Sequence, residues 1–169
     1  MSDRAEENIR ILPISEHLIG SLNACLDAVA RERSYLGFVE APPVEDSRKF
    51  VRSIMVGGGA MFVAVRGDEV VGWCDIIQAK QEGFRHNGSL GMGVLRAYRR
   101  LGWGGRLARK AIEWAKGTDV ERITLKVFAS NLAAISLYEK LGFEVEGVSR
   151  KARKIDGKYD DLIDMVLFT

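Results

Sequence analysis

The sequence predicts one α/β domain built on a mixed β-sheet that is flanked by helices. Two observations carry this prediction. Segments with alternating or continuous apolar character are interleaved with segments whose apolar residues recur at helical spacing. No internal repeat, linker or low-complexity tract divides the 169 residues, so we treat residues 1–169 as a single domain.

The N-terminal part of the chain predicts a strand followed by two helices. Residues 8–14 alternate between apolar and polar side chains, which is typical of a strand. Ser15 can cap a helix whose apolar positions recur at helical spacing, namely Leu18, Ile19, Leu22, Leu26 and Val29. A loop over 31–43 then leads to a second helix over 44–55, which the glycines at 57–59 end.

The remaining elements are predicted from the same periodicities. Residues 60–66 and 70–77 are two strands joined by a Gly67 turn, the pattern of a β-hairpin. After a polar loop over 78–88, the sequence predicts strands at 90–95, 123–128, 143–148 and 162–168, and helices at 103–116 and 132–141. An Asp156-Gly157 turn separates the last two strands. The predicted order is β-α-α-β-β-β-α-β-α-β-β.

Composition argues against several classes of protein. The net charge of +2, from 25 basic and 23 acidic residues, gives no bulk attraction to nucleic acid or to a membrane. No apolar run is long enough to span a bilayer, and the polar N-terminus is unlike a signal peptide, so we expect a cytoplasmic protein. Cys25, Cys74 and the two histidines lack metal-ligand spacing; we expect two buried thiols and no metal.

A basic, glycine-rich turn joins the strand at 90–95 to the helix at 103–116. It reads Arg99-Arg100-Leu101-Gly102-Trp103-Gly104-Gly105, and Arg106 follows. Glycines let main-chain N–H groups approach an anion, and the first turn of a helix leaves N–H groups unpaired at the positive end of its dipole. The sequence therefore predicts a phosphate-binding turn; the alternative is a turn that only joins a strand to a helix.

Two common phosphate motifs do not account for this turn. The chain contains no Gly-x-x-x-x-Gly-Lys-Ser/Thr run, as nucleotide hydrolases require. Gly102-x-Gly104 begins the dinucleotide fingerprint, but Leu107 stands where that fingerprint needs its third glycine. The pattern that remains is Arg99-x-x-Gly102-x-Gly104.

Two motifs in this order resemble the GNAT family of N-acetyltransferases. The pattern that begins at Arg99 is similar to the family's coenzyme A pyrophosphate loop, Gln/Arg-x-x-Gly-x-Gly/Ala. The segment 123–143 resembles the family's later motif, in which a strand ends at Asn131, a helix carries Tyr138 and a Gly-Phe pair starts the next strand. Together the two motifs cover roughly residues 88–148, and weaker resemblance extends to both ends.

The resemblance implies a coenzyme site between the fourth and fifth strands. In the family these strands splay apart, and the pantetheine arm of coenzyme A pairs with the exposed strand edge, in the manner of strand addition. The implied main-chain contacts are Met92, Gly93 and Val94 for the pantetheine and thioester, and Arg99, Arg100, Leu101, Gly102, Trp103, Gly104 and Gly105 for the pyrophosphate. We expect charge from Arg99, Arg100 and Arg106, and packing beneath the turn from the Trp103 side chain.

The resemblance also implies the residues that act after the coenzyme is bound. Asn131 contacts the coenzyme arm in the family, and asparagine is also a good helix cap. Tyr138 lies about two helical turns further on, where its hydroxyl faces the coenzyme sulfur. A phenol is protonated at neutral pH, so it can protonate the leaving thiolate. The alternative for Tyr138 is a core tyrosine on an amphipathic helix.

The general base stays open. Some members carry a glutamate on the fifth strand, where this chain has Lys126, and others carry one on the fourth strand, where it has Ser89. A lysine is a poor base unless its pKa is strongly lowered. The remaining candidates are water and the side chains of Glu32, Glu40, Asp75, Glu82 and His86.

The acceptor side is expected to be built from the first helix, the loop at 31–43, the loop at 78–88 and the C-terminal hairpin. Its expected walls are Tyr35, Phe38 and Tyr159. The hairpin carries a basic run (Arg150, Lys151, Arg153 and Lys154) followed by Asp160, Asp161 and Asp164. We expect cross-strand charge pairing between the two sets; the alternative is that a basic residue holds an acceptor carboxylate.

The resulting prediction is an acetyl-CoA-dependent N-acetyltransferase. Its acceptor is predicted to be the primary amine of a small molecule such as an amino acid, since the C-terminal segment resembles bacterial members that act on amino acids, amines or ribosomal-protein N-termini. The alternatives are a protein N-terminal or lysine acetyltransferase and a non-catalytic acyl-CoA sensor. A homodimer is expected only because dimers are common in the family.

Overall fold

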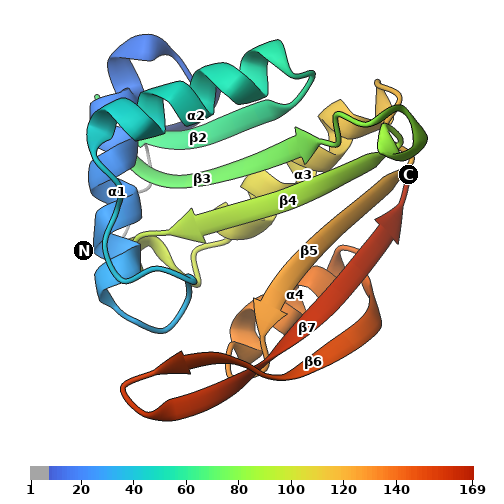
Figure 1. The fold of residues 1–169 in the computed structure, drawn as a ribbon. Coiled ribbons are helices and arrows are strands. Elements are labelled where there is room, and N and C mark those ends of the chain that lie inside the picture. Colours follow the sequence, from blue (N-terminus) through green and yellow to red (C-terminus); the bar gives the residue numbers. More distant parts are fainter. Residues whose placement is uncertain (1–7) are drawn as a thin grey trace.

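Seven strands form one mixed sheet in the computed structural model, which describes residues 8–169 (Figure 1). The polar N-terminus discussed above, residues 1–7, lies outside the described residues. The order across the sheet is β1-β2-β3-β4-β5-β7-β6. The strands are β1 (Ile9–Pro13), β2 (Ala60–Arg66), β3 (Glu69–Gln78), β4 (Asn87–Val94), β5 (Arg122–Phe128), β6 (Glu144–Ile155) and β7 (Lys158–Phe168).

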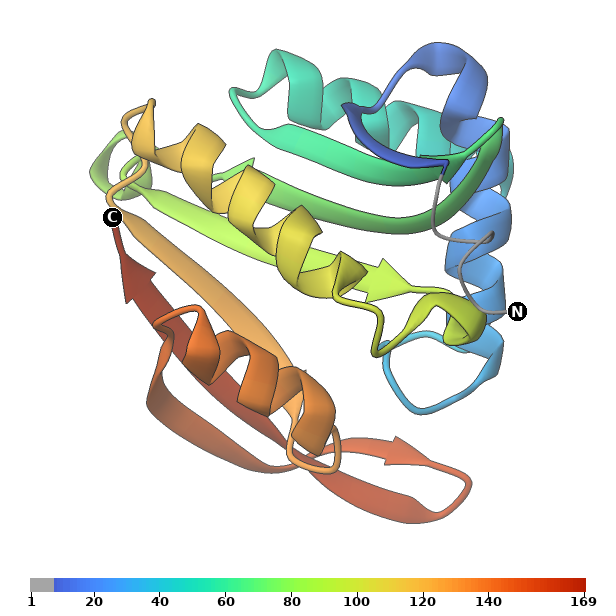
Figure 2. The ribbon, with the colours of Figure 1, turned by 180° about the vertical axis from the view of Figure 1, so that it is seen from behind.

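Helices cover both faces of this sheet. One face is covered by α1 (Ile19–Arg31) and α2 (Val44–Val56), and the other by α3 (Trp103–Lys116) and α4 (Leu132–Lys140), as Figures 1 and 2 show from the two sides. Among residues 8–169 there are also three short 3-10 turns, η1 (Glu16–Leu18), η2 (Glu82–Phe84) and η3 (Arg96–Tyr98). The predicted fold class and element order are confirmed.

Two separate apolar cores follow from this layering. Alternate residues of a strand point to opposite faces, so neighbours on β3 belong to different cores. Trp73 packs with Val29 of α1 and Ile54 of α2, whereas Cys74 packs with Leu107 of α3. Cys25 and Cys74 are both buried free thiols, as predicted.

β4 and β5 are the only parallel neighbours among the described strands, and they pair over a short stretch. Their register runs from Asn87–Arg122 to Ser89–Thr124 and then stops, and Figure 1 shows the two strands diverging beyond this point. The predicted splay between the fourth and fifth strands is therefore present. β4 begins at Asn87 rather than at residue 90, because this pairing extends the strand back into the predicted polar loop.

The first helix begins differently from the prediction. Ser15 precedes the 3-10 turn η1, and its side chain makes no capping bond to the main chain. The Ser15 hydroxyl lies 3.1 Å from Nδ1 of His17 instead. α1 proper starts at Ile19, although Leu18 and Leu22 are buried as the helical spacing predicts.

The C-terminal hairpin of β6 and β7 is longer than predicted, and its charges pair differently. Main-chain pairing continues to Ile155–Lys158, although the side chains there are polar and give no alternating signal. The predicted ion pairs between the basic run and the three aspartates are absent. Asp164 pairs with Lys126, the Ser130 hydroxyl donates to Asp160, and the Lys151 main-chain N–H donates to Asp161.

The tip of this hairpin is fastened to the loop that follows α1. The Arg33 guanidinium donates two hydrogen bonds to Asp156, at 2.9 and 2.7 Å, and Arg153 donates to the main-chain carbonyls of Arg33 and Ser34. Figure 1 shows the hairpin passing below the splay toward this loop. We call these contacts the hairpin clasp. It joins the two halves of the sheet at the open end.

Gly93 of β4 is required by packing, which gives a first prediction. A Cβ at this position would lie 2.2 Å from Cη2 of Trp73, whose ring lies across the glycine from β3. We expect Gly93→Ala to lower the free energy of unfolding by about 1–3 kcal/mol, because the ring must shift in a packed core. Urea unfolding measures this. Gly83→Ala, where a Cβ meets no atom within 4 Å, is the control and should change stability little.

Candidate active site

The main chain of β4 has a free edge where it leaves β5. The Leu95 N–H donates to Val71 O and the Ala79 N–H donates to Asn87 O. These two bonds show which opposite residues of β3 and β4 form hydrogen-bonded pairs. Since hydrogen-bonded and non-hydrogen-bonded pairs alternate in an antiparallel ladder, Gly93 bonds toward β3. Met92 and Val94 direct their main-chain groups into the splay. Of the three positions predicted on this strand, these two face the opening.

The turn before α3 presents main-chain N–H groups as the glycines predict. Gly102 is the N-cap of α3 with φ +85° and no side-chain cap, a conformation that favours glycine. The N–H groups at the start of α3, in Trp103, Gly104 and Gly105, precede the first intrahelical donor, Arg106. The site thus offers unpaired donors at a positive helix end, a surface that fits a pyrophosphate.

The Arg99 side chain makes contacts within the protein, whereas the sequence predicted that its charge would face the pyrophosphate. Its guanidinium forms a two-point ion pair with Glu32 of the segment after α1, with Nη1 at 2.8 Å from the carboxylate. Its Nε donates to Val94 O at 2.8 Å, and the group lies 4.5 Å from the centre of the Tyr35 ring. The Arg99 charge is therefore engaged. No ion pair of Arg96, Arg100 or Arg106 occurs within residues 8–169, so these arginines carry unpaired charges beside the turn.

A cavity of about 610 Å³ lies beside this turn. The residues that line it are Glu32, Ser34, Tyr35, Arg96, Arg99 and Arg100. Tyr35 thus lies beside the turn and not in the acceptor wall where it was expected. Trp103 is buried under the turn as predicted, with the Arg106 guanidinium 4.6 Å from its ring centre.

Gly104 gives a prediction for coenzyme binding. A Cβ there would lie 3.2 Å from Cε of Met92 and 3.4 Å from Cδ2 of Leu137, so a valine would fill the space between the turn and β4. We expect Gly104→Val to weaken acetyl-CoA binding about tenfold or more, the equivalent of an overpacking cost above ~1.4 kcal/mol. Titration calorimetry measures the affinity. Gly20→Val on α1, where a Cβ has open space, should leave it unchanged; normal affinity in folded Gly104→Val would contradict the pyrophosphate assignment.

α4 brings Asn131 and Tyr138 to the face of the splay opposite α1 and α2. Asn131 is the N-cap, and its Oδ1 accepts a hydrogen bond from the Ala134 N–H at 3.2 Å, as predicted. Tyr138 is buried in the core and meets Phe143 edge-on, with ring centres 5.8 Å apart. Burial, and to a lesser degree the nearby Cys74, raises the pKa of Tyr138 well above its ordinary value. The phenol therefore stays protonated and can donate.

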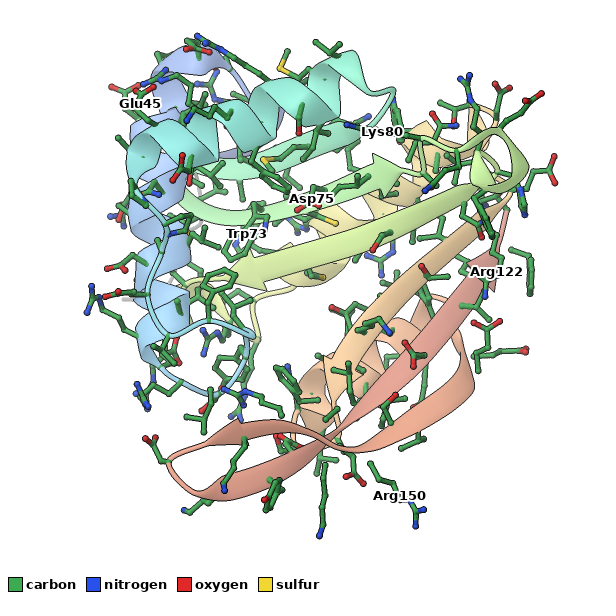
Figure 3. All side chains as sticks on the ribbon, in the orientation of Figure 1. Glu45, Trp73, Asp75, Lys80, Arg122 and Arg150 are labelled. Atoms are coloured by element: carbon green, nitrogen blue, oxygen red, sulfur yellow. The ribbon has the colours of Figure 1, made fainter. Side chains whose placement is uncertain are left out.

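On the other face, a second cavity of about 730 Å³ lies between the sheet, α1, α2 and the loop that joins them. Asp75 of β3 and Trp73 lie side by side on this face in Figure 3, while the labelled cations Lys80, Arg122 and Arg150 lie apart from them. Asp75 is 5% exposed, and its carboxylate makes no hydrogen bond within residues 8–169. Burial raises the pKa of Asp75 to about 7, which suits a general base at neutral pH.

The five side chains that were candidates for the general base lie in different places in the structure. Only Asp75 and Glu40 line the second cavity, and the Glu40 side chain is 70% exposed near Arg31. Glu32 is engaged by Arg99. Glu82 and His86 lie in the loop at the N-terminal end of β4, the end away from the splay. Lys126, at the position of a family glutamate, forms an ion pair with Asp164.

The second cavity is the candidate acceptor side, and it is lined by partly different elements than predicted. α1, the loop at 31–43 and Phe38 line it as expected, whereas the loop at 78–88 and the C-terminal hairpin with Tyr159 do not. α2, β3 and Trp73 also line it and were not predicted to do so. The signal for Trp73 was indirect: glycine at 91 and 93 reflects the Asp75 and Trp73 side chains lying over β4.

The described part of the chain lacks the features of several other site types. Within residues 8–169 no group of three or more histidine, cysteine or acidic side chains is placed to hold a metal ion. No helix of the same residues is long and apolar enough to cross a membrane. Burial raises the pKa of Cys25 to about 12 and that of Cys74 well above its ordinary value, so neither thiol is an activated nucleophile.

A splayed β4–β5 edge, a glycine-rich helix start and a buried tyrosine define the class of acetyl-CoA-dependent N-acetyltransferases, and comparison with known proteins agrees. Residues 22–143 match the model of the Acetyltransferase (GNAT) family. The chain belongs to the GNAT family of acetyltransferases, whose activity is acetyl transfer from acetyl-CoA to an amine.

Curated relatives span most of the chain. It is 30% identical over 133 residues to the L-amino acid N-acetyltransferase AaaT of Escherichia coli, covering 78% of this chain and 82% of that protein. It is 33% identical over 129 residues to an N-alpha-acetyltransferase of Saccharolobus solfataricus, covering 70% and 72% of the two chains.

Solved structures agree in fold over nearly the whole length. A GNAT-family acetyltransferase from Streptococcus pneumoniae superposes with a TM-score of 0.90 at 25% identity, covering 96% of this chain and 100% of that one. The putative acetyltransferase yncA from Salmonella typhimurium, solved with its cofactor acetyl-CoA, gives 0.89 at 17% identity, covering 96% and 94%.

Proposed function

We propose that this chain transfers the acetyl group of acetyl-CoA directly to the primary amine of a small molecule, with amino acids as the example that the E. coli relative suggests. The observation that carries this proposal is the second cavity. It contains the buried Asp75 and extends to Gly91 and Met92, where the free edge of β4 begins. A cavity of this volume has the size of a small-molecule site.

The coenzyme side is assigned from the free main-chain groups. Met92 and Val94 would pair with the pantetheine arm, with Asn131 also facing that arm. The N–H groups from Arg100 to Gly105, with the Arg100 side chain, would hold the pyrophosphate. The Val94 N–H is free to stabilise the negative charge that develops on the carbonyl oxygen, because Arg99 occupies only the Val94 carbonyl. Acetyl-CoA supplies the acetyl group as a thioester.

Two protons must leave the acceptor nitrogen, and one must reach the sulfur. Asp75 takes the first proton from the acceptor ammonium, and the freed amine nitrogen forms a bond to the acetyl carbonyl carbon as the carbon–sulfur bond breaks. Tyr138 gives its phenolic proton to the leaving sulfur, and the second proton of the nitrogen then returns to the Tyr138 oxygen, directly or through solvent, while Asp75 releases its proton to solvent. The high pKa values of Cys25 and Cys74 favour direct transfer over a covalent thiol intermediate.

Acetyl-CoA-dependent thiol release tests the proposal against a panel of amino acids, small amines, polyamines, aminoglycosides and peptides with free N-termini. We expect release with small primary amines. Release confined to peptides would establish the second candidate, N-terminal protein acetylation, which the name of the archaeal relative favours. No release with any amine, while calorimetry shows acetyl-CoA bound, would overturn the enzymatic proposal.

A further inference from the structure

The charged side chains that line the second cavity are all acidic. They are Asp75 at its base and Glu40 and Asp46 at its rim, and the lining contains no lysine, arginine or histidine from residues 8–169. Asp46 and Glu40 are 55% and 70% exposed, whereas Asp75 is buried. Because Asp46 already pairs with Lys49 and Glu40 lies near Arg31, the cavity attracts a cation chiefly at Asp75, which has no ion pair within residues 8–169 and where solvent screens least.

The nearest arginines are already paired with carboxylates. Arg31 lies 2.6 Å from Asp27 and 3.7 Å from Glu40, and Arg99 forms its two-point pair with Glu32. A carboxylate placed beside the acceptor amine would have to displace one of these partners or remain unpaired next to Asp75. Either choice costs free energy, since like charges in a partly buried site repel.

Apart from Ser47, the remaining wall of the cavity is apolar. Its side chains come from α1, the loop at 31–43, α2 and the sheet: Leu26, Leu36, Phe38, Pro42, Phe50 and Trp73. Burial of an apolar substituent against this wall is favourable in proportion to the area removed from water. The wall thus selects for an acceptor with an aliphatic or aromatic body.

We infer that the acceptor is a primary amine with an apolar body and no free carboxylate beside the amine: an arylalkylamine, or an aminoacyl unit whose carboxyl group is an amide. Its ammonium group occupies the space at Asp75, and its body lies against Trp73 and Phe50. This inference rests on the proposed function and narrows it: among the primary amines proposed there, free amino acids rank below amines that have no carboxylate. Free amino acids with the same side chain are poorer acceptors.

Three matched acceptors test the inference: 2-phenylethylamine, phenylalaninamide and phenylalanine, which differ only in the group beside the amine. We expect kcat/KM for the first two to exceed that for phenylalanine by about tenfold or more, the cost of one unpaired like charge. A value for phenylalanine equal to or above the other two would overturn the inference. Thiol release with any of the three would still support the proposed function, so the two failures are distinguishable.

A second test places a positive charge in the wall of the second cavity. Phe50 is 44% exposed on α2, so Phe50→Arg adds a cation to the cavity without filling the core. We expect it to raise the ratio of kcat/KM for phenylalanine to that for phenylalaninamide by about tenfold. Met55→Arg is the matched control, since Met55 is 61% exposed on the same helix and does not line the cavity. An unchanged ratio in folded Phe50→Arg would contradict the charge argument.

Discussion

Replacing Asp75 with asparagine is expected to lower kcat by about 10²–10⁴-fold, the usual contribution of a positioned general base. The amide has the shape of the carboxylate and cannot accept the ammonium proton. Acetyl-CoA affinity should stay normal, because Asp75 lies on the acceptor side of the sheet. Steady-state kinetics and calorimetry together separate the two effects. Glu82→Gln, at the far end of β4, is the control and should retain full turnover.

The pH dependence of the wild-type enzyme follows from the same residue. The pKa of Asp75 lies at about 7, so kcat/KM should rise as the pH increases through this value and the base form accumulates. The Asp75→Asn variant should lack this limb. A limb that persists unchanged in the variant would assign the titration to another group and remove Asp75 from the mechanism.

Asp75 should also lower the stability of the folded protein at neutral pH. Its folded-state pKa is raised above the unfolded value, so the folded state binds the proton more tightly, and stability declines as the pH rises from the unfolded value through about 7. Asp75→Asn should therefore be more stable than the wild type at pH 8, with the difference vanishing near pH 4. Thermal unfolding at the two pH values measures this. Gain of stability with loss of activity is the signature of a functional buried charge.

Removal of the Tyr138 hydroxyl is expected to have the second large effect on turnover. We expect Tyr138→Phe to lower kcat by about 10²-fold, because the leaving thiolate loses its proton donor. Since the hydroxyl acts mainly in the transition state, the affinity for acetyl-CoA should change little. Phenylalanine keeps the ring that meets Phe143, so the core stays packed.

Tyr98→Phe is the matched control for this variant. Tyr98 is also buried, and its ring lies under the Arg66 guanidinium on the β2 side of the molecule. Full turnover in Tyr138→Phe, or an equal loss in both variants, would show that Tyr138 is a packing residue of α4 and not the proton donor.

Much of the fold was predictable because it depends on local patterns. The apolar periodicity located the strands and helices, and Asn131 could be identified as a cap from its position before a helical segment. The long charged end of the C-terminal hairpin was not predictable, because main-chain pairing stabilises it without an apolar face.

The candidate site was only partly predictable, because the burial and the ion pairs that distinguish its residues depend on segments that lie far apart in the sequence. Sequence reasoning left Asp75 among five candidates, and only its burial under α2 and the connecting loop separates it from the others. The Glu32–Arg99 pair joins positions 67 residues apart, and no periodicity signals it. Gly93 is predicted as a coenzyme contact, whereas packing against a tryptophan on the neighbouring strand also requires a glycine there.

The hairpin clasp has a consequence for how such enzymes diversify. It connects the loop that shapes the acceptor cavity with a segment near the C-terminus, through Arg33, Asp156 and Arg153. None of these residues belongs to β3, β4, α3 or α4, which carry Asp75, the proposed coenzyme contacts and Tyr138. A change in the clasp can therefore move the loop that lines the second cavity while the elements that carry those groups stay unchanged, so the shape of the cavity and the machinery of acetyl transfer can vary separately.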